Sequence, residues 1–254
     1  YDVSTETRAK YNRAVHRTSS ALANAAYRTM AAEPTPEGKQ PEVTFVAGPT
    51  GAGKSTVADM PVFAETLQDS QVVVDGPLSH VGIAQQKIQY ALDHGKTVRI
   101  LYVHRDPVEA WDKGVVSRGK TEGRQPSIDY HLNSHVEGLR TIHMLADIYA
   151  DEPGVSIEYV RNVQGQPVGL IDRADLPRGY NADDVRHAIE SGGVARQAEV
   201  SQAVGASDSE AGREVDPAAR SEARPAEDVA APPQGDVWQQ IEQATEPPRE
   251  FSST

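Results

Sequence analysis

Runs of consecutive apolar residues predict five strands along this chain. Each run is short, rich in Val, Ile or Leu, and followed by Gly, Asp or Asn, which is typical of strands that are buried on both faces. The predicted strands cover residues 43–48, 71–76, 97–106, 155–162 and 168–172.

Between these runs the apolar residues recur every three or four positions, which predicts helices. One helix precedes the strands at 5–32, and the clearest lies at 126–149, where apolar side chains share one face. Further helices are predicted after the first strand to about residue 60, at 79–95, from Pro107 onward and at 181–193. Strands and helices in this order predict an α/β fold with a mainly parallel sheet.

Composition changes after the last predicted helix. Residues 195–254 are dominated by Ala, Ser, Glu, Pro and Arg, with twelve acidic residues against five arginines. Such a segment buries too little apolar surface to offset its ordering entropy, so we predict a disordered acidic tail, except for a short helix around 236–243. The predicted organisation is an N-terminal helix and linker at 1–40, an α/β domain at 41–194 and the tail at 195–254.

Totals over the 254 residues narrow the class of protein. The formal net charge of −12 disfavours a nucleic-acid partner, whose phosphates would be repelled. The absence of cysteine excludes disulfides, thiolate metal sites and a Cys nucleophile. No apolar run reaches the roughly 18 to 20 residues of a membrane span and no leader opens the chain, so we expect a cytoplasmic protein with no membrane partner. Because the first residue is Tyr1, we expect a fragment or a processed product.

The most specific motif is a glycine-rich turn, VAGPTGAGKST, between the first strand and the next helix. It fits the pattern G-x-x-x-x-G-K-S/T in full and lies in the context that this pattern requires. Its backbone N–H groups would surround a β-phosphate, Lys54 would reach the β and γ oxygens, and Ser55 would offer its hydroxyl to Mg²⁺. We therefore predict ATP or GTP binding with magnesium in a P-loop NTPase three-layer fold. The predicted nucleotide-binding residues are Gly48, Pro49, Thr50, Gly51, Ala52, Gly53, Lys54, Ser55 and Thr56.

Asp75 ends the second predicted strand. In a parallel sheet the carboxyl ends of the strands face one ligand crevice, so Asp75 and Arg105 are expected to converge there with the P-loop. A carboxylate at this place either holds Mg²⁺ together with Ser55 or accepts the proton of an attacking hydroxyl. An ordinary turn or helix cap is the alternative.

Basic residues gather in a glycine-punctuated segment at 111–126. Guanidinium groups placed over a γ-phosphate stabilise the charge that spreads over its oxygens during transfer, and a lid also excludes water. We predict a mobile lid, with a solvated basic loop as the alternative for any single residue. The basic residues are Lys113, Arg118, Lys120 and Arg124.

His131 and His135 lie one turn apart on the predicted helix at 126–149. The sequence between them lacks the Glu of a zinc-protease motif, and no third ligand is evident. We therefore favour contact with substrate or water over a metal site.

Four segments together resemble the zeta-toxin family of P-loop kinases and, more distantly, the polynucleotide-kinase-like small P-loop kinases. They are GPTGAGKST, DGPLSH before a helix, GKTVRILYVHRDPVEAW and SRGKTEGRQPS, and the resemblance covers about residues 43–162. It implies an ATP-dependent kinase, with Mg²⁺, that phosphorylates a hydroxyl of a small molecule such as a nucleotide sugar or a dinucleotide. It also implies an antitoxin protein as a partner, with the helix at 5–32 or the lid as contact surfaces.

The resemblance assigns Lys54 and Ser55 to the Walker residues, and Arg118 and Arg124 to the lid arginines. With Asp75, the lysine and the two arginines form the predicted catalytic set. Zeta toxins carry a longer insertion before the acidic strand end, with a catalytic Asp, whereas only about fifteen residues separate the P-loop from that strand here. Asp75 then corresponds to the later strand end, or it serves both purposes in a reduced site.

Two other functions stay open. The N-terminal helix and acidic tail favour an ATP-binding regulatory module of a larger protein, in which nucleotide binds but no acceptor is phosphorylated. The shortened architecture also permits a nucleic-acid 5′-end kinase, which the acidic charge disfavours.

Overall fold

A computed structural model describes residues 5–122, 126–163 and 165–192, which include the sheet that carries the P-loop. The chain separates into two units, Tyr1–Ala198 and Glu199–Thr254, and all described residues belong to the first. The predicted tail at 195–254 lies outside the described residues. Within the described part of the chain, no helix has the length and apolar character needed to span a membrane.

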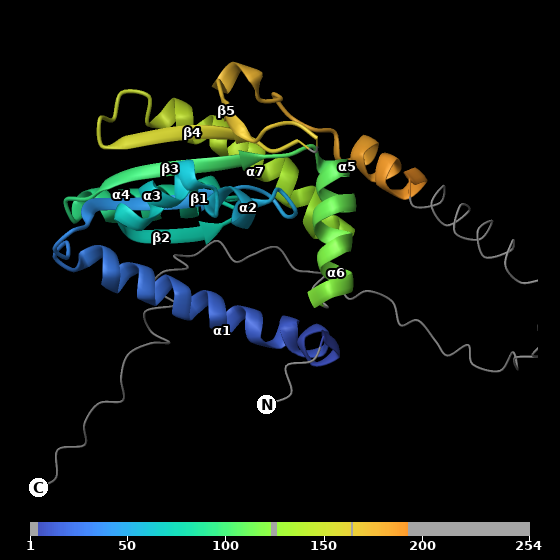
Figure 1. The fold of residues 1–254 in the computed structure, drawn as a ribbon, viewed down its shortest axis with the longest axis horizontal. Helices are drawn as coiled ribbons and strands as arrows, with labels where there is room; N and C mark the ends of the chain where they lie inside the picture. Colours follow the sequence, from blue (N-terminus) through green and yellow to red (C-terminus); the bar gives the residue numbers. More distant parts are fainter. Residues whose placement is uncertain (1–4, 123–125, 164, 193–254) are drawn as a thin grey trace, which may run out of the picture. The chain divides into compact units, whose positions relative to one another are not determined.

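Five strands form one sheet in the order β2-β1-β3-β4-β5 (Figure 1). The pairs of β1 with β2, β1 with β3 and β3 with β4 are parallel, and β5 runs antiparallel to β4. The predicted α/β fold with a mainly parallel sheet is therefore confirmed. The strands are β1 (Gln40–Ala47), β2 (Ser70–Gly76), β3 (Thr97–His104), β4 (Val155–Arg161) and β5 (Gly169–Ile171).

Helices connect the parallel strands, as crossover connections require. One of them, α3, was not predicted: Pro61 follows the end of the preceding predicted helix and itself occupies the first turn of α3. The helices are α1 (Thr5–Ala32), α2 (Lys54–Ala58), α3 (Pro61–Asp69), α4 (Val81–Asp93), α5 (Pro107–Glu109), the π-helix η1 (Ala110–Val115), α6 (Val116–Glu122), α7 (Ile128–Ile148) and the 3₁₀ turn η2 (Arg173–Asp175). A further helix covers 182–192, and Asn181 caps it by accepting from the backbone N–H of Asp183 at 2.9 Å.

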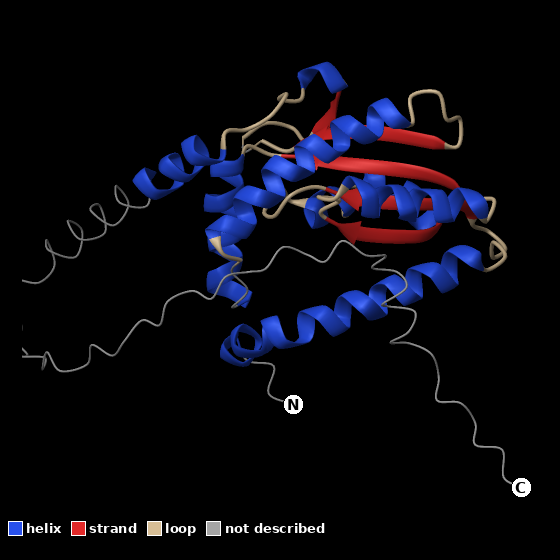
Figure 2. Ribbon diagram, turned by 180° about the vertical axis from the view of Figure 1, so that it is seen from behind, coloured by secondary structure: helices blue, strands red, loops and turns tan. Residues whose placement is uncertain are grey.

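Side chains of the central strands alternate between two cores. On β3, Ile100 and Tyr102 face the larger core, which α1, α4 and α7 cover. Leu101 and Val103 face the opposite side, where they pack against α2 and α3. The sheet thus lies between two helical layers (Figures 1 and 2), which is the three-layer arrangement that the P-loop predicts.

The second half of α1 belongs to the larger core. Tyr27 and Ala31 are buried there, and the Tyr27 hydroxyl donates to the carbonyl oxygen of Lys87 on α4 at 2.5 Å. The helix predicted at 5–32 is therefore present, and its second half packs on the core through Tyr27 and Ala31. Leu22 and Met30 face solvent instead.

Candidate nucleotide-binding site

The carboxyl ends of the parallel strands bring the P-loop and Asp75 together. In the register of β1 and β2, Val46 lies opposite Asp75, one residue before β1 ends and two before the first P-loop glycine. The turn then leads into α2, which begins at Lys54. This is the crevice in which α/β sheets bind their ligands.

Glycine is required at three P-loop positions because the backbone is tightly surrounded. Gly51 and Gly53 adopt φ angles of 74° and 86°, in the left-handed region that side chains disfavour. A Cβ atom would overlap the carbonyl oxygen of Val103 at Gly48, the carbonyl oxygen of Ala110 at Gly51 and the side-chain amide of Asn162 at Gly53. The turn therefore has a fixed shape, with backbone amides next to the N-terminus of α2, and this arrangement suits a phosphate.

Lys54 bends back over this turn. Its Nζ donates to the carbonyl oxygen of Gly48 at 3.0 Å and lies 3.8 Å from Oδ1 of Asp75. Burial lowers the pKa of the Lys54 ammonium, the Asp75 carboxylate acts in the opposite direction, and the positive charge of Arg118 lowers the pKa further. An added phosphate would offset both effects that lower the pKa.

The two residues that would hold Mg²⁺, Ser55 and Asp75, are of the types that P-loop sites use. Ser55 lies in the first turn of α2 and is exposed, and Asp75 has 68% of its side chain exposed, so both reach the crevice. In P-loop proteins the metal takes most of its ligands from phosphates and water rather than from a protein cage. Consistent with this, no group of three or more His, Cys, Asp or Glu that could hold a metal occurs within the described ranges.

The two histidines of α7 bind Thr50 of the P-loop. Nδ1 of His131 lies 2.7 Å from Oγ1 of Thr50, and Nε2 of His135 lies 3.0 Å from the Thr50 carbonyl oxygen. Ser134, between them, accepts from the Thr50 backbone N–H at 3.2 Å. All three side chains are buried, so the expected contact of the histidines with substrate or water is replaced by contact with the protein's own backbone.

Burial keeps these histidines neutral. It lowers the pKa of His131, and it lowers the pKa of His135 to about 3, where the neighbouring His131 acts in the same direction. The ring of His131 also packs edge-on against Trp111, with ring centroids 5.1 Å apart. A metal site at this pair is not supported, because three of their four ring nitrogens are already hydrogen-bonded to protein oxygen atoms, namely the Thr50 hydroxyl, the Thr50 carbonyl and the Pro107 carbonyl.

Asn162 supports the P-loop from the end of β4. Its side-chain amide donates to the carbonyl oxygen of Ala52 at 2.8 Å, and its backbone N–H donates to the carbonyl oxygen of His104 at 2.9 Å. Sequence reasoning missed this residue, although an Asn at the carboxyl end of a parallel strand is a usable signal.

The two residues between β3 and α5 each bind a residue of that helix. Arg105 donates from Nε and Nη2 to Oε1 of Glu109, at 3.0 and 2.7 Å, and so forms an ion pair with the last residue of α5. Asp106 caps α5 by accepting from the backbone N–H groups of Val108 and Glu109. The structure thus pairs Asp75 with Lys54 and Arg105 with Glu109.

The segment predicted as a mobile lid is mostly helical, and the helix predicted from Pro107 onward is present. α5, η1 and α6 follow one another without a break from Pro107 to Glu122, in a column at the end of the sheet toward which the strands point (Figure 1). Gly114 does not interrupt this column. A Cβ at Gly114 would come 2.6 Å from the Cα of Gly51, so this glycine allows the column to touch the P-loop.

The column carries the described basic residues of the predicted lid, Lys113 on η1 and Arg118 and Lys120 on α6. Arg118 is exposed, and its charge acts on Lys54, which places it near the phosphate-binding ammonium. Lys113 and Lys120 are exposed as well. Arg124 lies outside the described residues.

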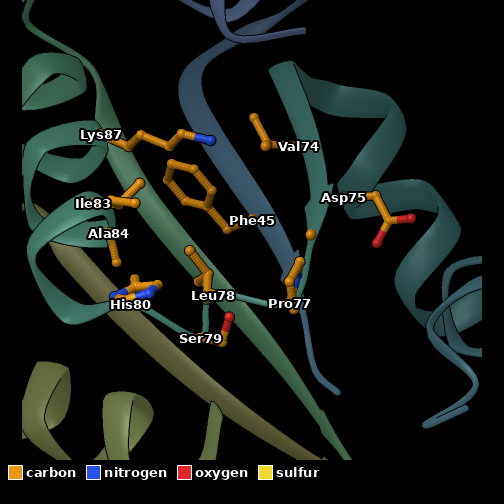
Figure 3. A pocket seen from close by; sticks show the side chains of 11 residues that line it. Phe45, Val74, Asp75, Pro77, Leu78, Ser79, His80, Ile83, Ala84 and Lys87 are labelled. Carbon is orange, nitrogen blue, oxygen red and sulfur yellow. The ribbon is translucent and has the colours of Figure 1, made fainter. Parts of the chain in front are cut away.

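A cavity of about 190 Å³ opens beside the end of β2, on the side of the sheet that α4 covers (Figure 3). Phe45, Val74 and Ile83 form its apolar wall, and Lys87 points into it. The carboxylate of Asp75 points away from these side chains in Figure 3. The cavity and the P-loop therefore flank the end of β2 from two sides.

Similarity searches connect part of the chain to known proteins. No curated protein sequence matches it. One chain of the crystal structure of AvrRxo1-ORF1:AvrRxo1-ORF2 with sulphate ions is similar with a TM-score of 0.47 and 17% identity, covering 63% of this chain and 66% of that chain. A chain of the AvrRxo1-ORF1:-ORF2 structure with ATP gives the same TM-score and identity over 64% and 67%. A chain of the PezAT chromosomal toxin-antitoxin system of Streptococcus pneumoniae gives 0.36 and 12% over 66% and 85%.

A family model described as Zeta toxin matches residues 24–76. The matched segment begins in the second half of α1, includes the complete P-loop and ends with β2, so it contains both Lys54 and Asp75. Over this segment, the match confirms the resemblance to the zeta-toxin family that the motifs predict.

Proposed function

We propose that the protein is an ATP- and Mg²⁺-dependent phosphotransferase of the zeta-toxin type, which phosphorylates a hydroxyl of a small molecule such as a nucleotide sugar or a dinucleotide. The observation that carries this proposal is the pair of Lys54 and Asp75, whose Nζ and Oδ1 lie 3.8 Å apart at the mouth of the P-loop. A phosphate-binding ammonium beside an exposed carboxylate brings together the two groups that phosphoryl transfer to a hydroxyl needs.

Each residue then has a defined task. When bound, ATP supplies the phosphoryl group and Mg²⁺ neutralises charge on its oxygens. The P-loop amides and Lys54 bind and orient the phosphates, and Ser55 holds the metal. Asp75 accepts the proton of the attacking hydroxyl or shares the metal, and Arg118 stabilises charge on the transferring group. Arg124 is assigned the same task as Arg118 by the family resemblance alone.

The finer predictions belong to this proposal as well. A cytoplasmic location, a small-molecule acceptor and an antitoxin protein as a partner are what a zeta-toxin-like kinase implies. The organisation into an N-terminal helix at 1–40, a kinase domain at 41–194 and a tail at 195–254 is part of the same proposal.

The test is a transfer assay on the purified full chain. The protein is incubated with γ-labelled ATP and a small-metabolite extract, and products that gain one phosphate are identified by mass spectrometry. Wild-type protein should form such a product, while Lys54→Ala and Asp75→Asn should abolish it. Asp69→Asn serves as the control, because this exposed carboxylate precedes β2 at the end of the strand opposite Asp75.

Three outcomes would change the conclusion. ATP binding without any labelled product would favour the regulatory module. Transfer to an oligonucleotide 5′ end, but not to small molecules, would favour the nucleic-acid kinase. Full activity of Asp75→Asn would remove Asp75 from proton transfer.

A further inference from the structure

One P-loop residue, Thr50, has every polar atom bound to a side chain of α7. Its backbone N–H donates to Ser134, its carbonyl oxygen accepts from His135, and its hydroxyl lies 2.7 Å from Nδ1 of His131. The N–H and the carbonyl belong to the two peptide groups on either side of Thr50. Both of these peptide planes are therefore fixed from a helix about eighty residues away in the sequence.

We propose that His131, Ser134 and His135 are positioning residues that hold the P-loop in its nucleotide-binding conformation, and that His131 and His135 thereby set the affinity for ATP. All three side chains are buried, and they act through their hydrogen bonds to Thr50. The inference rests on the proposed function, since it assumes that the P-loop binds ATP.

The directions of the hydrogen bonds follow from the acceptors. Nε2 of His131 lies 2.8 Å from the carbonyl oxygen of Pro107, which can only accept, so this nitrogen carries the proton. Nδ1 of His131 then has a free electron pair and accepts from the Thr50 hydroxyl. In His135 the proton is likewise on Nε2, because its partner is the Thr50 carbonyl oxygen, which can only accept. One neutral tautomer therefore satisfies each contact.

His135 is the more informative of the two histidines. Its Nδ1 is buried and has no hydrogen-bond partner among the described residues. An unpaired buried polar atom lowers stability, so an apolar residue would suit this place better if folding alone decided it. The bond to Thr50 is the one polar contact that the structure gives the ring, and it points to a task at the P-loop.

The P-loop has reason to depend on such support. Its amides must point toward the phosphates, and the first glycines give the turn little stiffness of its own. A free loop would have to be ordered when the nucleotide binds, which lowers affinity, whereas a loop already held by α7 avoids that loss.

The experiment measures ATP affinity and thermal stability of the full chain for Thr50→Val, His131→Leu and His135→Leu. His143→Leu is the matched control: it lies on the same helix and its Nε2 also binds a proline carbonyl oxygen, that of Pro177 at 2.9 Å, away from the P-loop. Each of the first three variants should weaken ATP binding by about tenfold, the effect of losing one buried hydrogen bond. His143→Leu should lower the melting temperature and leave the affinity for ATP within about twofold of wild type.

A purely structural role gives a different result. In that case the histidine variants would lose stability like His143→Leu and keep the ATP affinity of wild type, and the inference would be overturned. If His131→Leu does not fold, Thr50→Val decides alone, because it replaces the hydroxyl with a methyl group of similar size. Wild-type protein that binds no ATP would overturn the proposed function together with this inference. If Lys54→Ala loses ATP binding while Thr50→Val, His131→Leu and His135→Leu keep the wild-type affinity, only the inference is overturned.

Discussion

The two sides of the crevice differ in how firmly the fold holds them. On the donor side, the P-loop is enclosed by the backbone of β3 and η1 and bound by side chains from α7 and β4. On the acceptor side, Asp75 has 68% of its side chain exposed, and it forms an ion pair with Lys54, whose Nζ lies 3.8 Å from its Oδ1. The difference teaches that this fold fixes the phosphate site before any ligand binds and leaves the place of the acceptor open.

The largest effect is expected from filling the contact between the P-loop and η1. Gly51→Ala places a methyl group against the carbonyl oxygen of Ala110 and should abolish detectable ATP binding, while lowering the free energy of unfolding by about 3 kcal/mol. Gly95→Ala measures the cost of a left-handed backbone without a steric clash, because Gly95 has a φ angle of 71° but nothing within 4 Å of an added Cβ. It should cost only about 1 kcal/mol and preserve ATP binding. Equal effects in urea unfolding and in titration with ATP would show that the donor side is not rigid.

The next effect should separate binding from transfer. Arg118→Ala removes a charge that acts on Lys54, and the rate of phosphoryl transfer should fall by about 100-fold, since guanidinium groups act mainly on the transition state. The affinity for ATP should change much less. Lys120→Ala, an exposed cation on the same helix, is the control and should keep the rate of wild type within about threefold. Equal losses of rate in both variants would show that the cations of α6 act only through their general positive charge and that Arg118 has no specific role.

The sequence alone predicts features that depend on neighbouring residues, and it misses contacts between residues far apart in the chain. The strands are evident because buried parallel strands give continuous apolar runs, and the P-loop is evident because its residues are contiguous. The bonds from His131 and His135 to Thr50 join residues 81 and 85 positions apart, and no local pattern encodes such a pair. The one helix that was missed, α3, has a local cause.

Gly114 lies inside the helix predicted from Pro107 onward, in η1. Only a glycine fits there against the Cα of Gly51. Glycine breaks a helix in isolation at a cost of about 1 kcal/mol, and the packing of η1 against the P-loop outweighs that cost. The missed helix α3 begins at Pro61, and a proline that ends one helix also suits the first position of the next.

A smaller effect should appear in the pH dependence of stability. The pKa of His135 is lowered to about 3 in the folded state, below the ordinary value of 6.5, so the unfolded chain binds a proton that the folded chain refuses. The buried neutral ring therefore costs no stability above pH 6.5, and the free energy of unfolding decreases as the pH falls from 6.5 toward 3. Between pH 7 and pH 5 this histidine alone should lower the free energy of unfolding by about 2 kcal/mol. Urea unfolding of His135→Leu at both pH values should show a loss smaller by that amount, and an unchanged loss would mean that the ring is not neutral by burial.

The smallest effect tests whether the support of the P-loop depends on the end of the helix that provides it. The hydroxyl of Ser127 caps α7 by accepting from the backbone N–H of Tyr130 at 3.2 Å, one turn before His131. Ser127→Ala should lower the free energy of unfolding by about 1 kcal/mol, the usual value of an N-cap, as measured by urea unfolding. ATP affinity should stay at the wild-type value, because His131 is also held by the Pro107 carbonyl and by Trp111. If the affinity falls as far as it does in His131→Leu, then the first turn of α7 is loose without its cap, and the rigidity of the donor side depends on one exposed hydroxyl rather than on the buried contacts beneath the P-loop.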